Sequence, residues 1–176
     1  MKIIIIDPGH GGDDPGATGN LASTVIKEKD LNLKIGLLTK SFLIDANYDV
    51  YMTRYIDTWV SLSARAKLSN EHHADFFLSI HCDADPEKKG RGFTVYYFSE
   101  KGREWAEKLA SGLAGLPLHN RGIAFGNFQV LRETKCPAIL LECGFMTNGE
   151  DLTWLSRATN QMALARAITN AIKKFL

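Results

Sequence analysis

The chain has 176 residues, of which 45% are hydrophobic and 10% aromatic, which is enough to bury the core of one globular domain. A net charge of +1 argues against nucleic acid or anionic lipid as a partner. Three cysteines without C-x-x-C spacing argue against a disulfide framework, and the N-terminal run of four isoleucines is too short for a signal peptide or a membrane span. We therefore expect a single domain over residues 1–176, made in the cytoplasm without a signal peptide and not inserted in a membrane.

Short apolar runs predict buried strands, and helical patterns separate most of these runs. In chain order we expect strands at residues 3–7, 49–54, 75–81, 92–98, 128–132 and 138–145, helices at 28–46, 62–74 and 100–116, and a closing helix with apolar residues repeating through 164–175. Residues 117–127 follow neither pattern, so we expect an irregular surface loop there, near the functional site. Strands that alternate with helices need crossover connections. The pattern therefore predicts a three-layer α/β/α sandwich around a mostly parallel, twisted sheet of about six strands.

Three polar side chains lie where predicted strands end. His10 follows the first strand by three residues, His81 closes the strand at 75–81, and Glu142 lies near the end of the last strand. In an open parallel sheet, ligands collect beyond the carboxyl ends of the strands. Two imidazoles and a carboxylate are a ligand set of catalytic zinc, which keeps a fourth position for water. One histidine beside a glycine turn is more often an ordinary hydrogen-bonding residue, but the joint placement of all three favours a metal site.

Two acids compete for a place in this site. Glu28 begins the predicted helix at 28–46, and Glu142 lies in an otherwise apolar strand, where a carboxylate is costly unless it is paired or metal-bound. One of them would bind the metal and the other would act as the general base on an attacking water. The residue pattern alone does not distinguish these two assignments.

Two other functions fit the sequence less well. The stretch GHGGDDPGATG does not complete a G-x-G-x-x-G motif, and no Walker lysine follows it, which argues against nucleotide binding. A cysteine hydrolase would need a thiol beside a base, yet neighbouring residues of a strand point to opposite faces, so Cys82 turns away from His81 and Cys143 turns away from Glu142. Buried packing is the expected fate of these thiols.

Five separated motifs occur in order between about residue 3 and residue 155: DPGHGGDDPGATG, EKDLNL, MTRYIDTWVSLSARAKLSNEHHADFFLSIHCDA, NRGI and VLRETKCPAILLECGFMTN. On these motifs the chain resembles the zinc-dependent N-acetylmuramoyl-L-alanine amidases of bacterial autolysins and bacteriophage endolysins. The resemblance implies a three-layer α/β sandwich and hydrolysis of the amide between the lactyl group of N-acetylmuramic acid and L-alanine in bacterial peptidoglycan. It implies one zinc ion held by His10, Glu28 and His81, and it makes Glu142 the catalytic acid and base rather than a ligand.

The resemblance also defines what to test. Relatives commonly carry Asn where this chain has Asp83, which leaves the local hydrogen bonding and the stem-peptide contacts in question. We expect Asp7 to orient one of the zinc-binding imidazoles.

The alternatives to the amidase function are a zinc peptidase that cuts within the stem peptide and a non-catalytic wall-binding module. The missing signal peptide suggests an endolysin or a mother-cell lytic enzyme, with any wall-binding domain lying outside this chain.

Overall fold

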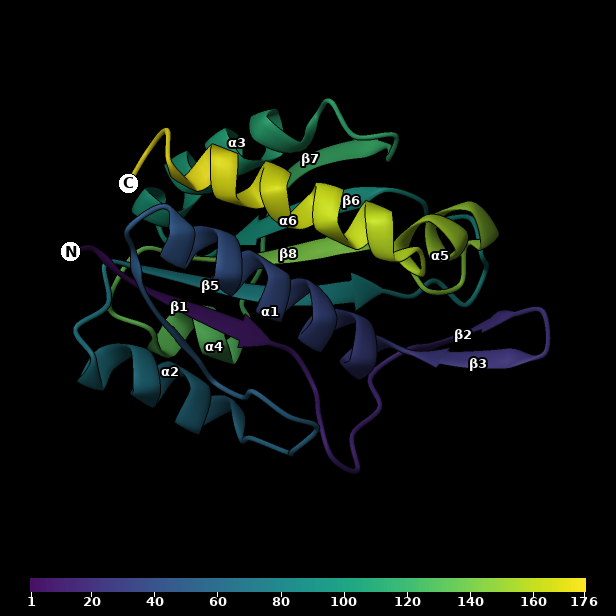
Figure 1. Cartoon of the computed structure of the whole chain (residues 1–176), viewed down its shortest axis with the longest axis horizontal. Helices are drawn as coiled ribbons and strands as arrows, with labels where there is room; N and C mark the ends of the chain where they lie inside the picture. The colour runs from purple at the N-terminus through teal and green to yellow at the C-terminus, as the bar shows by residue number, and fades with distance from the viewer.

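Six strands form one mixed sheet between two layers of helices, and a short hairpin stands apart from it (Figure 1). The computed structural model describes all residues from 1 to 176. The strands are β1 (Ile3–Pro8), β2 (Thr18–Leu21), β3 (Thr24–Lys27), β4 (Asp49–Met52), β5 (Phe76–Asp83), β6 (Phe93–Tyr97), β7 (Asn120–Phe125) and β8 (Ala138–Phe145). The helices are α1 (Glu28–Asp45), α2 (Leu62–Glu71), α3 (Glu100–Leu113), α4 (Gln129–Glu133), α5 (Gly149–Leu155) and α6 (Ala158–Ile172).

The strand order of the main sheet is β4-β1-β5-β8-β6-β7. The first four of these strands run parallel to one another, β6 runs antiparallel to β8, and β7 is parallel to β6. The predicted three-layer α/β sandwich with a mostly parallel sheet of about six strands is confirmed. Because β1, β5 and β8 are parallel and adjacent, their carboxyl ends meet at one edge of the sheet.

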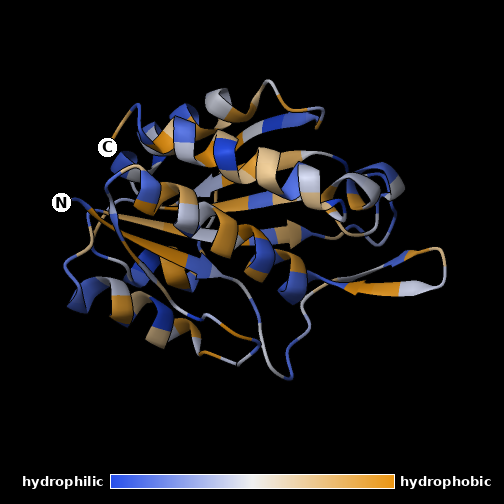
Figure 2. Ribbon diagram, viewed as in Figure 1, coloured by the Kyte–Doolittle hydropathy of each residue, from blue (hydrophilic) through white to orange (hydrophobic).

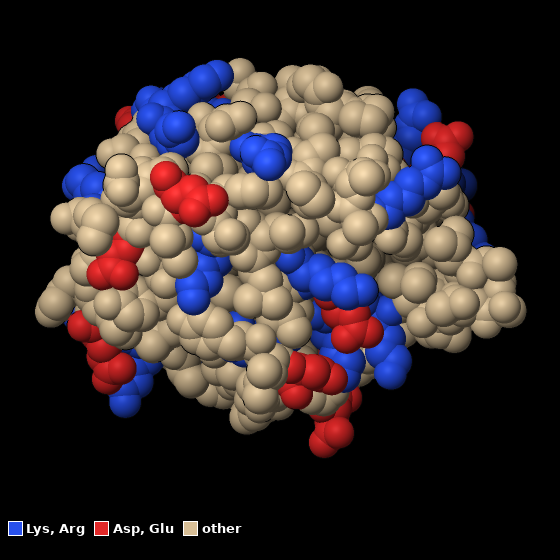
Figure 3. All heavy atoms as spheres, in the orientation of Figure 1, with Lys and Arg blue, Asp and Glu red and all other residues tan.

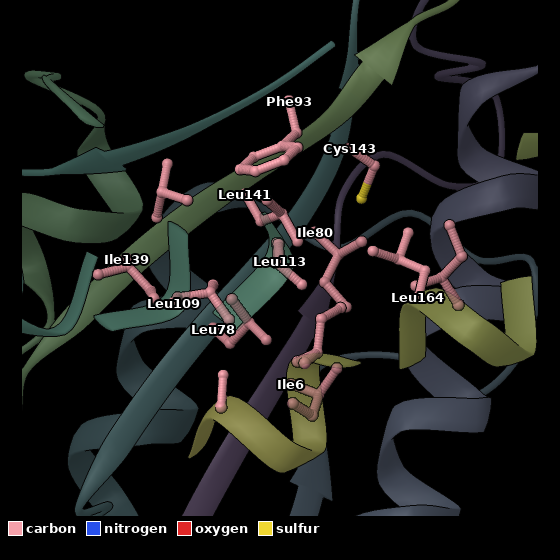
Figure 4. Packing of buried hydrophobic residues seen from close by; sticks show 14 of the residues in the cluster. Ile6, Leu78, Ile80, Phe93, Leu109, Leu113, Ile139, Leu141, Cys143 and Leu164 are labelled. Atoms are coloured by element: carbon pink, nitrogen blue, oxygen red, sulfur yellow. The ribbon is translucent and has the colours of Figure 1, made fainter. Parts of the chain in front are cut away.

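The two faces of the sheet are covered unequally. Helices α1, α3 and α6 pack on one face, where α1 and α6 lie side by side across the view in Figure 1, and the shorter α2 and α4 pack against each other on the opposite side. Strand alternation sends Ile6, Leu78 and Ile80 into the larger core under α1 and α6, shown in Figure 4, whereas Ile5 and Phe77 enter a smaller core with residues of α4. Figure 2 shows how hydrophobic β1 and β8 are along their length. Each fully buried large apolar side chain stabilises the fold by roughly 1.5–3 kcal/mol.

Two predicted elements were wrong. Residues 128–132 were expected to form a strand, but α4 occupies Gln129–Glu133, and its consecutive Val130 and Leu131 both pack into the smaller core. A short apolar run does not by itself distinguish a strand from one turn of buried helix. The expected loop at 117–127 contains β7, an edge strand whose residues are mostly exposed or half-buried and therefore lack an apolar run. The β2–β3 hairpin, also largely exposed, was not predicted either.

No helix of this structure combines the length and the apolar character needed to span a bilayer. On the face shown in Figure 3, lysines and arginines lie among aspartates and glutamates rather than in one continuous basic patch.

Candidate metal centre and catalytic site

Three side chains from three elements converge at the carboxyl edge of the sheet. His10 lies in the loop after β1, Glu28 is the first residue of α1, and His81 lies near the end of β5. One carboxylate oxygen of Glu28 lies 3.1 Å from His10 Nε2, and the other lies 3.0 Å from His81 Nδ1. Candidate ligand atoms of the three residues all lie within 4.8 Å of one another, so this group could hold a metal ion.

Glycines let these parts of the chain approach so closely. A Cβ at Gly9 would overlap the His81 ring, and a Cβ at Gly16 would overlap the Glu28 carboxylate and the His10 ring. His10 itself has a φ of 61°, a left-handed conformation that costs on the order of 1–3 kcal/mol for a non-glycine residue. Arg65 holds this strained residue in place by donating from Nη2 to the His10 carbonyl at 2.9 Å.

Asp14 orients the His10 imidazole. Its Oδ2 lies 2.7 Å from His10 Nδ1, and its Oδ1 accepts from the Gly16 amide at 3.0 Å. This contact leaves Nε2 of His10 directed toward Glu28. A carboxylate on the second nitrogen of a ligating histidine fixes the tautomer and makes the free nitrogen more basic.

The expectation that Asp7 orients an imidazole was wrong. Asp7 is fully buried and pairs instead with Arg65 Nη1 at 2.7 Å, and it also accepts from the hydroxyls of Thr53 and Ser79. Asp7 therefore acts on His10 only through Arg65, which binds the His10 backbone.

Glu28 is held as a carboxylate. It accepts hydrogen bonds from the amides of Ala17 and Cys82 and from the side chain of Asn32. Burial would raise its pKa, but hydrogen bonds with His10 and His81 and their charges hold the pKa far below the usual 4.5. A buried, permanently ionised acid between two imidazoles is a favourable arrangement for a cation.

The pKa of His10 is shifted in the opposite direction. Burial lowers it, but the hydrogen bonds and negative charges of Glu28 and Asp14 outweigh burial and leave the pKa above its ordinary 6.5. A divalent cation at His10 would therefore compete with a proton that these two acids help to hold on the ring.

Glu142 lies beside this group but outside it. It is the register partner of His81 across β5 and β8, so both side chains leave the same face of the sheet. Its Oε2 atom is inaccessible and has no hydrogen-bond partner. Burial, followed by the negative charges of Glu28 and Asp83, raises the pKa of Glu142 well above 4.5. The geometry thus separates the two acids that the sequence left as alternatives: Glu28 contacts both histidines, and Glu142 stands free.

A family model described as N-acetylmuramoyl-L-alanine amidase matches residues 4–174, nearly the whole chain. The chain belongs to this family. It is 39% identical over 174 residues to "Probable cell wall amidase LytH" of Staphylococcus aureus, a match that covers 98% of this chain and 57% of that protein. The chain thus spans little more than half the length of this curated relative.

Solved structures of the amidase family share the fold. The catalytic domain of CwlV, the N-acetylmuramoyl-L-alanine amidase from Bacillus (Paenibacillus) polymyxa var. colistinus, matches with a TM-score of 0.94 and 33% identity, covering 99% of this chain and 98% of that one. The amidase AmiC2 of Nostoc punctiforme matches with a TM-score of 0.93 and 35% identity, covering 99% of this chain and 96% of that one. The sandwich described above is therefore the fold of this family.

The thiols lie away from the site, as the strand alternation predicted. Cys82 and Cys143 are buried in the larger core, on the face opposite to His81 and Glu142, and Cys143 is visible among core side chains in Figure 4. A hydrogen bond with the Cys143 thiol, together with burial, raises the pKa of Cys82 well above its usual range. Both thiols are buried on the face away from His81, so neither has the neighbouring base that a cysteine hydrolase needs, which argues against that alternative.

Sequence reasoning missed the residues that support the His10 loop. Arg54, only 2% exposed, donates to the carbonyls of Pro8, Gly9 and Lys29 at 2.7–2.9 Å. Arg65 adds bonds to the loop from α2, and Asp14 closes the loop on the imidazole. The one available signal was the arginine at the end of the strand expected at 49–54, but a pattern of neighbouring residues does not distinguish a buried arginine from a solvated one.

Proposed function

We propose that this domain is a zinc-dependent N-acetylmuramoyl-L-alanine amidase that hydrolyses the amide between the lactyl group of N-acetylmuramic acid and L-alanine of the peptidoglycan stem. The observation that carries the proposal is the His–Glu–His group with an unpartnered carboxyl group, that of Glu142, beside it. Family membership supports the substrate class, and the similarity to the probable cell wall amidase of Staphylococcus aureus supports the cell wall as the place of action.

The donor set fits zinc. Two imidazole nitrogens and a carboxylate oxygen are a ligand set of catalytic zinc, and here one such atom from each residue lies within 4.8 Å of the others. We assign His10, Glu28 and His81 as the three ligands of one ion. An ion bound there supplies a Lewis acid that polarises the scissile carbonyl and makes water reactive near neutral pH.

The protein's own groups complete the reaction. Glu142, the unpartnered acid beside His81, takes the proton of the attacking water as the water oxygen bonds to the lactyl carbonyl carbon. Glu142 then passes that proton to the nitrogen of L-alanine as the carbon–nitrogen bond breaks. The products are a lactyl carboxylate and a free amino terminus. Asp14 keeps His10 oriented throughout, and the sheet edge keeps Glu142 next to His81.

Product analysis tests this assignment. Purified sacculi are incubated with the zinc-loaded chain, and the soluble products are examined by mass spectrometry and amino-terminal labelling. The proposal requires new L-alanine amino termini that disappear with a chelator and return when zinc is restored. New termini within the stem would instead identify a peptidase, and sedimentation with sacculi without any new terminus would identify a wall-binding module. The exposed-surface variant Glu104→Gln serves as a control for handling and should match the wild type.

A further inference from the structure

A cavity of about 400 Å³ opens beside the candidate metal group. His10 and His81 line it together with Trp59, Val60 and Leu62. The Trp59 side chain is 63% exposed and the Leu62 side chain 51% exposed, which is unusual for such large apolar groups. Ligand cavities of this size are typically lined by apolar and aromatic side chains with a few polar groups that fix orientation.

The Trp59 segment is held firmly against the metal-site loop. The glycines at 11 and 12, with φ of 133° and 61°, leave no Cβ between the loop and the backbone of Thr58 and Trp59. Asp57 accepts from the Gly12 amide at 2.8 Å and from Lys29 Nζ at 2.6 Å, tying the same segment to the loop and to α1. The backbone that carries the exposed indole is therefore held at a fixed place relative to the His10 loop.

The charges around this cavity suit an uncharged ligand rich in hydroxyl groups. Arg65 is only 3% exposed, and its guanidinium is occupied by Asp7 and by the carbonyls of Pro8, His10 and Val60. No lysine or arginine therefore presents an unpaired charge to the cavity. The charged group that remains partly exposed is Asp14, a carboxylate that accepts hydrogen bonds from hydroxyls and repels anions.

A free cation lies on the other side of the metal group. In the strand order, β5 separates β1, which leads into the His10 loop, from β8, β6 and β7. Arg121 on β7 is exposed, lies 5.2 Å from the centre of the Phe145 ring, and its charge acts on Asp83 and Tyr96. Peptidoglycan stems carry carboxylates, whereas the sugar rings of the glycan are uncharged and expose C–H faces that stack on aromatic rings.

We propose that Trp59 is the platform for the saccharide part of the substrate. The glycan strand then extends over the Trp59 and Leu62 wall, and the anionic stem peptide leaves across Glu142 toward Arg121. This inference rests on the proposed amidase function, because it orients that function's substrate across the metal group. Trp59 thereby determines specificity for a glycan-linked amide over a free peptide.

The test measures saccharide binding without hydrolysis. The zinc-loaded full chain is titrated with the β-1,4-linked tetramer of N-acetylglucosamine, which has the neutral glycan chemistry and no peptide, while the indole N–H resonances of the three tryptophans are followed by NMR. We expect the Trp59 resonance to shift on binding. Trp59→Ala should weaken binding at least about tenfold, and Trp59→Phe should retain most of it. Ile56→Ala, which removes an equally exposed side chain (69%) three residues away, should leave binding unchanged.

Equal saccharide affinity in the wild type and in Trp59→Ala would overturn the proposal, as would no saccharide binding at millimolar concentration. A fall in affinity for a free stem peptide in Trp59→Ala would overturn it too, because the substrate would then lie the other way round. With intact glycan strands as substrate, the same variant should raise KM and leave kcat nearly unchanged. Saccharide binding that needs Trp59, without any release of L-alanine termini, would refute the proposed function alone. The inference alone would be refuted if the wild type releases L-alanine termini while Trp59→Ala changes neither the kinetics of that release nor the saccharide affinity.

Discussion

His81 and Glu142 are register partners on the adjacent strands β5 and β8, and both side chains leave the same face of the sheet. Neighbouring strands lie about 4.8 Å apart, so this pairing holds an unpartnered acid one strand away from a candidate metal ligand. Two rigid strands position both groups, which is more precise than a flexible loop would allow. The register thus holds the acid proposed for proton transfer beside a proposed metal ligand.

Glu142→Gln should separate these two roles. The amide has nearly the same shape as the carboxyl group but does not shuttle a proton, so amide hydrolysis should fall by about 10²–10⁴-fold. Zinc content should stay near one ion per chain, because the group of three ligands is intact. Metal analysis and the rate of release of L-alanine termini, measured on the same sample, check both statements. Wild-type rates in this variant would remove Glu142 from the mechanism.

Asp14→Asn should weaken metal binding. The amide does not hold the His10 imidazole as the carboxylate does, and loss of such a partner typically costs about 10–100-fold in metal affinity. The matched control is Asp13→Asn, which removes the same charge from the exposed neighbouring residue. Competition with a chromophoric zinc chelator measures both affinities. Similar losses in the two variants would mean that the effect is one of general charge rather than of orientation.

The affinity for zinc should fall as the pH is lowered. The fall should begin at a higher pH than it would if His10 had the ordinary pKa of a histidine. In the metal-free protein, Glu28 and Asp14 raise the pKa of His10 above 6.5, so the proton competes with zinc below that raised pKa. The carboxylate of Glu28 stays ionised throughout this range, because its pKa is strongly lowered. Each proton that competes for an imidazole ligand predicts a loss of about tenfold in affinity per pH unit below that imidazole's pKa, and His10 starts this loss. Histidine changes its charge between about pH 5 and 8. A zinc affinity that does not change over this range would contradict the assignment of His10 as a ligand.

Asp83→Asn should shift the pH dependence of activity to lower pH. The negative charge of Asp83 is one cause of the raised pKa of Glu142, so removing it lowers that pKa. Glu142 must be ionised to accept a proton from water, and activity is therefore lost as the pH falls through its pKa. The acidic limb of kcat/KM should move toward lower pH, whereas the basic limb should stay in place. An acidic limb that does not move would show that Asp83 has no electrostatic effect on the general base.

Arg65→Met should destabilise the fold strongly. The substitution leaves Asp7, which is fully buried, without its ion pair, and breaking such a pair costs about 3–5 kcal/mol. The control Arg103→Met removes an exposed arginine whose pairing with Glu107 on α3 should contribute little, about 0–1 kcal/mol. Denaturant unfolding followed by circular dichroism measures both free energies. Equal effects of the two substitutions would contradict a structural role for the buried pair.

Much of the fold could be read from the sequence because strand and helix periodicity are local properties. The apolar runs predicted five of the six sheet strands, and β8 was predicted with its observed bounds, Ala138–Phe145. Residues 128–132 and β7 failed for the same reason: a one-turn buried helix and an exposed edge strand both lack a distinctive local pattern. Strand alternation also predicted that the thiols turn away from the site.

The sequence by itself determined which side chains reach the edge of the sheet, because His10 and His81 directly follow or close buried strands. Only the tertiary structure showed which groups each acid contacts there. Glu28 contacts both imidazoles, whereas Glu142 has no hydrogen-bond partner. Asp14 bonds the His10 ring, and Asp7 forms an ion pair with Arg65. The physical reason is distance along the chain: Asp7 and Arg65 are 58 residues apart, and Glu28 and His81 are 53 apart. Such contacts depend on how distant segments pack, which periodicity and spacing within one segment do not encode.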